Sequence, residues 1–406
     1  MDRSSISQGQ LYDVVVVGAG AVGTALAWKL AAEGYRVCVC EQNQSVPESL
    51  RLDALSHPVL SLFRELGLLE VLRPVLMPLD SVAHFRNGHL VKGTSEGPYV
   101  VSYDRLVESL RPRLVKVATV IWERAVQVSV QGRIKSVRLE SGQVVCGWIV
   151  VLANGAVQAG GVDPLTEGPV RTICPEYSRT FSWDLEFEDT DRMTHPALVF
   201  QTTHSAHGYH ALKLFDLGEG RVRANFLTYW SSGDKRRREL LEGDALSVVA
   251  RTVEGLIPYA GPFRMMSPIE ETVADLSQPE NPEESGIVSA GDACGATAPS
   301  GPLGLRKGLH DVRVLAELMS RWEREARTGS EDLSAYYAHP AKHAIDGETL
   351  ARSVRDRKVA IDWRPAWATR RLIGDRIPDW VEAAFVGSAV RQSLNLARQS
   401  RSGLDS

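Results

Sequence analysis

Glycines near the start of the chain have the spacing of a dinucleotide-binding turn. Gly18, Gly20 and Gly23 follow residues 14–17, a valine run typical of a strand buried on both faces of a parallel sheet. In this G-x-G-x-x-G pattern the first glycine permits a tight turn, the second lets the backbone approach a pyrophosphate, and the third allows a helix to pack on the strand. The N–H groups at the start of that helix then face the phosphates.

An acidic residue at the distance expected for a ribose ligand completes the motif. The helix predicted after Gly23 ends at Gly34, and a second strand over residues 36–40 leads to Glu41. Its carboxylate is placed to accept hydrogen bonds from both hydroxyls of an adenosine ribose, which argues against a 2′-phosphate. The motif predicts a dinucleotide site, but it does not separate NAD from FAD.

The rest of the chain does not continue the strand and helix alternation of an NAD dehydrogenase. The sequence predicts a hairpin at Asn87-Gly88, a short helix over 104–110 and an antiparallel meander over 125–152. Residues 170–263 alternate in polarity, which predicts a second domain built on an antiparallel sheet. A polar linker is expected over 277–284. The chain after residue 330 is expected to be helical, with interruptions at Pro340, Pro365 and Pro378.

A second segment with the residues for cofactor chemistry starts at Gly291-Asp292. It follows a short apolar strand, and an aspartate at a strand end suits a polyol hydroxyl. A loop then opens a long helix, with Ser300 as the expected N-cap and Pro302 in the first turn. Beside a flavin, the positive end of this helix would stabilise the negative charge that reduction places on the ring. Taken alone, the segment is equally compatible with an ordinary capped helix.

Composition and charge exclude several classes of protein. The chain has 406 residues, 44% of them hydrophobic, and a net charge of −4. It is therefore neither disordered nor collagenous, and nucleic acid is not an expected partner, so the KRRR run at 235–238 is interpreted as a solvated face. The five cysteines lack C-x-x-C spacing, and neither a signal peptide nor a transmembrane segment is predicted. These features predict a soluble cytoplasmic protein.

Together the motifs resemble the FAD-dependent monooxygenases of the 4-hydroxybenzoate hydroxylase and ubiquinone-hydroxylase type, the class A flavoprotein monooxygenases. The resemblance rests on the glycine motif with Glu41, on Arg51 in LRLDAL, on Arg105 in YDRLVESL and on the GD segment. This segment matches the family pattern without a gap at Gly291, Asp292, Pro299, Gly304, Gly308 and Asp311.

The resemblance implies an α/β fold with a Rossmann-like, glutathione-reductase-like FAD-binding domain. An antiparallel β-sheet substrate domain is inserted into it, and a helical C-terminal tail follows. The implied boundaries are 1–76, 96–168 and 278–330 for the FAD-binding domain, 77–95 and 169–277 for the substrate domain, and 331–406 for the helical region.

The family's functional residues carry over to this chain at matching positions. Arg51 and Arg105 are expected to contact the FAD ribose and pyrophosphate, and Asp292 the ribityl chain. Arg306 and Pro299 are the predicted catalytic residues. The predicted cofactor-binding residues are Gly18, Ala19, Gly20, Ala21, Val22, Gly23, Glu41, Gln42, Arg51, Arg105, Asn154, Gly155, Asp292, Gly304 and Leu305.

Four positions depart from the family pattern. Asn154 replaces an aspartate associated with FAD and NAD(P)H contacts, and it lacks the charge and can donate as well as accept hydrogen bonds. Gly295 replaces a histidine, and Leu303 and Arg306 replace a glutamine and an asparagine. Two roles are open to Arg306, stabilising the reduced flavin or binding an acidic substrate.

The activity implied is that of a monooxygenase using NAD(P)H and dioxygen. A flavin C4a-hydroperoxide would hydroxylate or epoxidise an aromatic, polycyclic or quinone-like small molecule. One alternative is an FAD-dependent reductase or dehydrogenase of an isoprenoid or polyketide, which Asn154 and the altered loop favour. Another is a non-catalytic FAD-binding protein. Stable membrane insertion is not expected, and the oligomeric state stays open between monomer and homodimer.

Histidines and aromatic residues of the predicted sheet allow further interpretations. The spacing of His204, His207 and His210 does not put them on one strand face, so a metal site is not expected, and a plain surface or packing role is favoured over a substrate contact. The aromatic residues of this region are expected in the core more than in a pocket. They are Trp183, Phe200, Phe226, Tyr229 and Trp230.

Overall fold

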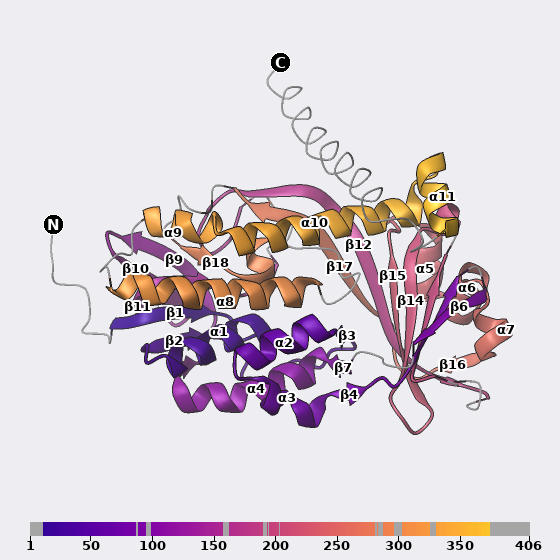
Figure 1. The fold of residues 1–406 in the computed structure, drawn as a ribbon, viewed down its shortest axis with the longest axis horizontal. Coiled ribbons are helices and arrows are strands. Elements are labelled where there is room, and N and C mark those ends of the chain that lie inside the picture. The colour runs from indigo at the N-terminus through magenta and orange to yellow at the C-terminus, as the bar shows by residue number, and fades with distance from the viewer. Residues whose placement is uncertain are drawn as a thin grey trace, which may run out of the picture.

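The computed structural model shows two sheet-based parts side by side, with one long helix running along both (Figure 1). Predicted site residue Pro299, together with Ser300, Pro302 and Pro378, lies outside the described residues. The structure describes residues 11–373 apart from 87, 95–98, 157–161, 190–192, 194, 203, 281, 283–286, 296–302 and 325–329.

The first part is a layered sheet that carries the glycine motif. Strands β2, β1 and β11 run parallel, and β11 continues through β10 and β9 as the antiparallel meander expected from the sequence. Both faces of β1 are covered, because Val14 and Val16 lie in one apolar core and Val15 and Val17 in another. In sheet order the strands are β8 (Thr119–Ile121), β2 (Val37–Cys40), β1 (Leu11–Val17), β11 (Val144–Leu152), β10 (Ile134–Leu139) and β9 (Ala125–Gln131), and β18 (Val288–Ser289) pairs with β11.

Helices cover one face of this sheet. The contact of α8 with α1 is close, since a Cβ atom on Gly308 would lie 2.3 Å from the Val22 side chain. Helix α4 is longer than the sequence predicted, because an apolar stripe that includes Leu110 and Leu114 carries it past Pro112. The helices of this part are α1 (Ala21–Ala32), α2 (His57–Glu65), α3 (Leu69–Leu72), η1 (Arg73–Val75), α4 (Tyr103–Val117), η5 (Gly291–Cys294) and α8 (Leu303–Arg324).

The second part is a large sheet, antiparallel except where β5 lies parallel to β13. The predicted hairpin forms as β5 and β6, and it joins this sheet although it interrupts the first part in the sequence. Strand β17 extends past the expected start of the linker, since Pro279 still pairs with Val170 of β12. The strands are β16 (Phe263–Met265), β12 (Val170–Phe187), β15 (Arg221–Thr228), β14 (Tyr209–Asp216), β13 (Ala197–Gln201), β5 (Val82–Arg86), β6 (His89–Thr94) and β17 (Glu270–Pro279).

Aromatic side chains fill the core between this sheet and three helices, α5 (Lys235–Glu242), α6 (Ala245–Thr252) and α7 (Leu256–Ala260). The core interpretation is confirmed for most of the predicted aromatic set, but Tyr229 packs apart, against Tyr177. The buried members are Trp183, Phe200, Phe226 and Trp230.

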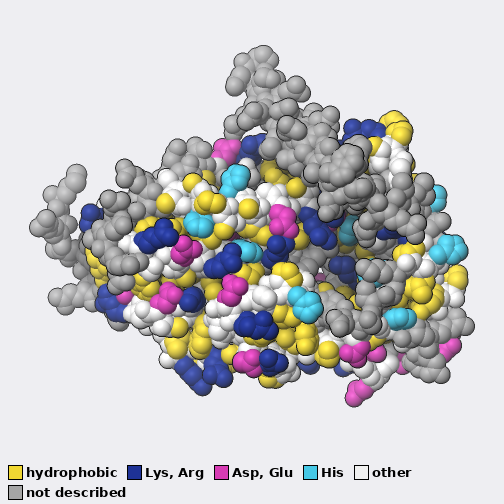
Figure 2. Space-filling model, in the orientation of Figure 1, with side chains coloured by type: hydrophobic (Ala, Val, Ile, Leu, Met, Phe, Trp, Pro, Cys, Tyr) yellow, Lys and Arg dark blue, Asp and Glu magenta, His cyan; other side chains and the backbone are white. Residues whose placement is uncertain are grey.

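The KRRR run differs from the solvated face that the sequence predicted. Arg237 pairs with Glu271, with Nη2 2.6 Å from Oε2, and Arg236 lies over the Trp230 ring and pairs with Asp234. These two arginines therefore tie α5 to the sheet, whereas Lys235 is exposed. On the face seen in Figure 2, Lys and Arg side chains are interspersed with Asp and Glu.

The helices after residue 330 connect the two parts. Pro340 and Pro365 begin helices instead of interrupting them, because the first helical position lacks an intrahelical N–H partner. Helix α10 packs on α8 at one end and reaches β14 and η3 (Ser205–His207) at the other (Figure 1). The helices are α9 (Ser330–Tyr337), α10 (Pro340–Ile361) and α11 (Pro365–Ile373). No helix of the described residues is long and apolar enough to cross a membrane.

A small sheet connects the two parts as well. Asn225 of β15 donates its Nδ2 hydrogen to the backbone oxygen of Leu52, at 3.3 Å, and Val100 packs in the same apolar cluster as Leu52 and Val82. The strands are β3 (Leu52–Leu55), β7 (Tyr99–Ser102) and β4 (Met77–Pro78).

Candidate functional site

A cavity opens at the carboxyl ends of β1 and β11, where α1, α4 and the start of α8 meet. Most of the predicted cofactor-binding residues line it: Gly18, Gly20, Ala21, Val22, Glu41, Arg51, Asn154, Gly155, Asp292, Gly304 and Leu305. Residues outside the predicted cofactor-binding set also line it: Val46, Pro47, Tyr103, Val107, Arg111, Ala153 and Ala290, together with Gly291 of the GD segment.

The glycine turn has the backbone that its sequence pattern predicts. Gly18 has a φ of +102°, and a Cβ atom there would lie 2.6 Å from the backbone oxygen of Ala153. At Gly23 a Cβ atom would lie 2.0 Å from the Gly18 oxygen, so only glycine lets α1 pack this closely on the turn. Gly20 is the N-cap of α1 and has no side chain to cap the first turn. This geometry suits a pyrophosphate at the helix N-terminus.

Glu41 is held in place at the end of β2. Its Oε2 accepts a hydrogen bond from the Ala19 N–H at 2.7 Å, and its Oε1 accepts one from the Asn43 N–H at 2.8 Å. Arg111 lies behind it, with Nη2 3.5 Å from Oε2. Because each carboxylate oxygen has a further lone pair, Glu41 retains acceptor capacity toward the cavity.

Arg111 is the basic residue that the sequence reasoning missed. It donates from Nε to the Ala19 oxygen at 3.1 Å and from Nη1 to the Asn43 oxygen at 2.7 Å. Burial lowers the pKa of its guanidinium, and Glu41 partly offsets this. The available signal was its position one turn after Val107 on the buried stripe of α4, but the predicted helix ended before it.

Four predicted cofactor-binding residues are not among the described residues that line the cavity. Ala19 and Gly23 are buried within the glycine turn, whereas Arg105 on α4 and Gln42 after β2 are exposed. Arg51 does line the cavity, pairs with Asp53 at 3.2 Å and lies over the Tyr103 ring, 5.0 Å from its centroid. Asp53 holds the pKa of Arg51 above its ordinary value.

The GD segment forms a second part of the cavity wall. Gly291 has a φ of +64°, which turns the chain so that Asp292 faces the start of α8. The Asp292 Oδ1 lies 3.0 Å from the position that a Cβ atom on Gly304 would take, so glycine allows the carboxylate this close to the helix. Asn154 and Gly155, at the end of β11, complete this end of the cavity.

Predicted catalytic residue Arg306 points elsewhere. Its Nη1 lies 2.6 Å from Oε1 of Glu348 on α10, and it is not among the described residues that line the cavity. A role at the cofactor would require this ion pair to open. At Gly295, φ is +133°, a conformation that side-chain-bearing residues rarely adopt, so the family's histidine would be strained here.

The histidines of the second part form a separate group. His204 and His207 lie with ring centroids 5.5 Å apart and face Glu254, while His210 lies on β14. Burial lowers the pKa values of His207 and His210. The described part of the chain contains no group of three or more side chains arranged to hold a metal ion.

Known proteins share the glycine motif and the fold of this chain. Residues 13–49, which hold the glycine motif and Glu41, match the family model of FAD-dependent oxidoreductases (DAO). p-Nitrophenol 4-monooxygenase PnpA from Pseudomonas putida superposes with a TM-score of 0.70 at 18% identity, over 96% of this chain and 98% of that one. The chain has the fold of the flavoprotein monooxygenases.

Other solved structures share the fold. PqsL of P. aeruginosa, in complex with 2-aminobenzoylacetate, has a TM-score of 0.67 at 18% identity, over 89% of this chain and 99% of that one. The Diels-Alderase PyrE3 has a TM-score of 0.63 at 20% identity, over 95% and 79%. The curated protein sequences contain no match. Identities this low establish the fold and leave the reaction to be argued from the site.

Proposed function

We propose that the protein is an FAD-dependent monooxygenase that uses NAD(P)H and dioxygen to hydroxylate or epoxidise an aromatic, polycyclic or quinone-like small molecule. The observation that carries this proposal is that the glycine turn, Glu41, Asp292 and the start of α8 line one cavity together. When bound, FAD supplies the hydride acceptance and the dioxygen chemistry, and the protein supplies position and electrostatics.

The lining residues fit an extended dinucleotide with separate tasks. The turn from Gly18 to Gly23 and the start of α1 would hold the pyrophosphate, and Glu41 the adenosine ribose. Asp292 would accept hydrogen bonds from the ribityl hydroxyls. The start of α8, at Gly304, would place its positive end near the ring and favour negative charge there on reduction.

We place the substrate on the face of the second sheet that turns toward β3. Register puts Lys213, Asn225 and Ser182 in one row across β14, β15 and β12. Ser182 Oγ lies 3.0 Å from Asn225 Oδ1, and Asn225 also bonds to Leu52, next to Arg51 in the cavity. The row thus offers polar groups to orient a substrate beside the cofactor cavity. Burial lowers the pKa of Lys213, with Asp53 opposing the shift.

A reductase or dehydrogenase is the second candidate, favoured by Asn154. This amide lines the cavity where the family carries an aspartate, so a nicotinamide contact of the usual kind lacks its charge. The same cofactor site would then serve substrate reduction or oxidation without dioxygen.

One experiment separates the candidates. The purified protein is titrated with FAD while its absorption is recorded, and NADH or NADPH oxidation and dioxygen uptake are followed across an aromatic and polyketide panel. Substrate-stimulated oxygen uptake with an oxygenated product supports the monooxygenase. Turnover that persists without oxygen supports the reductase. FAD binding without any turnover identifies a non-catalytic flavoprotein, and a protein that takes up no FAD contradicts all three.

A further inference from the structure

The strand that leads into the Asp292 wall is held weakly by its sheet. β18 pairs with β11 only through Val288 with Val151 and Ser289 with Leu152. Central strand β1, by contrast, pairs along its length with β11. A ladder this short provides few backbone hydrogen bonds to fix the turn that follows it.

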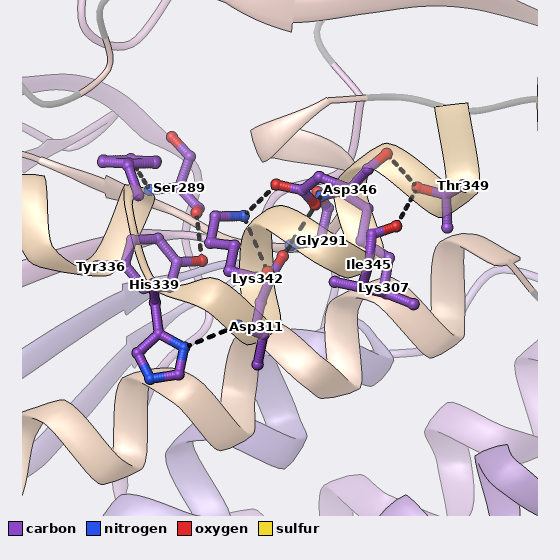
Figure 3. Close-up of polar contacts among 12 residues, drawn as sticks. Ser289, Gly291, Lys307, Asp311, Tyr336, His339, Lys342, Ile345, Asp346 and Thr349 are labelled. Atoms are coloured by element: carbon purple, nitrogen blue, oxygen red, sulfur yellow. Dashed lines mark hydrogen bonds and ion pairs between the residues drawn. The ribbon is translucent and has the colours of Figure 1, made fainter. Parts of the chain in front are cut away.

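Side chains from two helices, α9 and α8, hold this strand and turn instead (Figure 3). From α9, Tyr336 donates its hydroxyl to the Ser289 oxygen at 3.1 Å, and the Tyr337 hydroxyl accepts the Ser289 N–H at 3.0 Å. From α8, Asp311 Oδ2 accepts the Gly291 N–H at 2.9 Å, and Lys307 Nζ donates to the Gly291 oxygen at 2.8 Å. Both backbone groups of Gly291 are therefore bonded to charged side chains.

Asp311 is in turn held by a lysine of α10. Lys342 Nζ lies 2.9 Å from Asp311 Oδ1 and 3.0 Å from Oδ2 of Asp346. Asp311 has none of its surface exposed, and Lys342 and Lys307 have 1% and 2%. Burial acts to raise the pKa of Asp311, but the two lysines outweigh it and the net shift is downward, so the carboxylate stays ionised.

Stability alone does not account for such a cluster. Removing charges from water costs several kcal/mol per ion, and replacing a buried ion pair with apolar residues is often neutral or stabilising. What the charges provide is direction, because an ionised carboxylate accepts the Gly291 N–H and the Lys342 ammonium along defined lines. The side chain that completes this cluster, Lys342, comes from α10. No described residue of α10 lines the cavity.

We propose that Lys342 is a positioning residue of the cofactor site: through Asp311, α10 fixes the Gly291-Asp292 turn at the cavity wall. The inference rests on the proposed FAD binding for its functional consequence. It also predicts that α10, which packs on β14 of the second sheet, links the substrate domain to this wall.

The test compares Lys342→Met with wild type in the full chain. FAD affinity is measured by fluorescence titration, and hydrogen exchange is measured in peptides covering residues 288–292. We expect affinity to fall by about tenfold or more and exchange of the Ser289 and Gly291 amides to rise. If Lys342→Met does not fold, the double variant Asp311→Asn, Lys342→Met is tested in its place. It removes both charges together, and we expect the same changes in affinity and exchange.

Glu348→Gln is the matched control. It breaks a different ion pair between α8 and α10, Arg306 with Glu348, without touching Gly291. We expect its affinity and exchange to stay within about twofold of wild type. A folded Lys342 variant with wild-type affinity and exchange overturns the proposal, as does an equal effect of Glu348→Gln. If wild type takes up no FAD, the proposed function fails, while the exchange comparison still decides whether Lys342 positions the turn.

Discussion

The two walls of the cavity are built by different means. The wall at Gly18 to Gly23 is made by backbone: β1 lies between β2 and β11, and its turn closes through contacts too short for any side chain. The wall at Gly291 and Asp292 follows a strand with two paired residues and is held by Asp311, Lys307 and their partners. We call the wall at Gly18 to Gly23 the backbone wall and the wall at Gly291 and Asp292 the side-chain wall. The backbone wall should be sensitive to added atoms, and the side-chain wall to lost charges.

The largest effect is expected at the backbone wall, from Gly23→Ala. The added Cβ atom would meet the Gly18 oxygen at 2.0 Å, and backbone on both sides leaves little room to shift. We expect a loss of more than about 3 kcal/mol in the free energy of unfolding, measured by urea denaturation.

The matched control is Gly34→Ala, at the end of α1. Its φ is +96°, but nothing lies within 4 Å of the added atom. Only the backbone strain should remain, at about 1 to 2 kcal/mol. Equal losses in the two variants would show that close packing of the turn is unimportant.

Arg111→Met should have the next largest effect. It removes hydrogen bonds to the Ala19 and Asn43 oxygens and leaves Glu41 without its cation. We expect a loss of roughly 2 kcal/mol in the free energy of unfolding and an FAD affinity lower by about tenfold. Urea denaturation and fluorescence titration measure the two.

Arg105→Met serves as the comparison for Arg111, since both residues lie on α4 and Arg105 is exposed. Its unfolding free energy should stay within about 0.5 kcal/mol of wild type. An FAD affinity that falls more for Arg105→Met than for Arg111→Met would restore Arg105 as the cofactor ligand of α4.

A smaller, pH-dependent effect is expected where α10 meets the second sheet. Burial lowers the pKa of His210 below its ordinary value of 6.5, with Asp356 of α10 opposing and Lys213, Arg352 and Arg355 adding to the shift. Protonation therefore favours the unfolded chain. The free energy of unfolding should therefore fall as the pH drops from 6.5 toward the lower folded-state pKa.

Urea denaturation of wild type and His210→Asn at neutral and mildly acidic pH measures this contribution. The variant should lose less stability on acidification, whereas His57→Asn, at an exposed position on α2, should follow wild type. Identical pH dependence in all three proteins would show that His210 does not contribute to this loss of stability. Faster FAD release at acidic pH in wild type alone would connect this contact to the side-chain wall.

The smallest effect is expected from Gln42→Ala. The side chain is exposed and follows Glu41 without lining the cavity among the described residues. FAD affinity in the same titration should change by less than about twofold. A larger loss of affinity would show that the backbone wall continues past Glu41 to Gln42.

The backbone wall could be predicted from the sequence because its information is local. The valine run, the glycine spacing and Glu41 lie within one short stretch of chain, and each residue's task follows from the backbone of the turn that contains it. The hairpin at Gly88 and the meander before Asn154 were predicted for the same reason, since turn residues act on their immediate neighbours.

Side-chain contacts behind both walls join residues far apart in the chain. Arg111 bonds to Ala19 and Lys342 to Asp311, and no spacing rule connects such positions. Arg306 was assigned to the cofactor because of its place in the motif, but Glu348 on α10 provides a partner that the motif does not contain.

The sequence by itself determined the glycine turn, Glu41 and the place where Asp292 would appear, because contiguous residues specify local backbone geometry. Only the tertiary structure decided which charges stand behind them. A buried ion needs a partner wherever the fold brings one, and that partner is chosen by packing and not by position in the sequence.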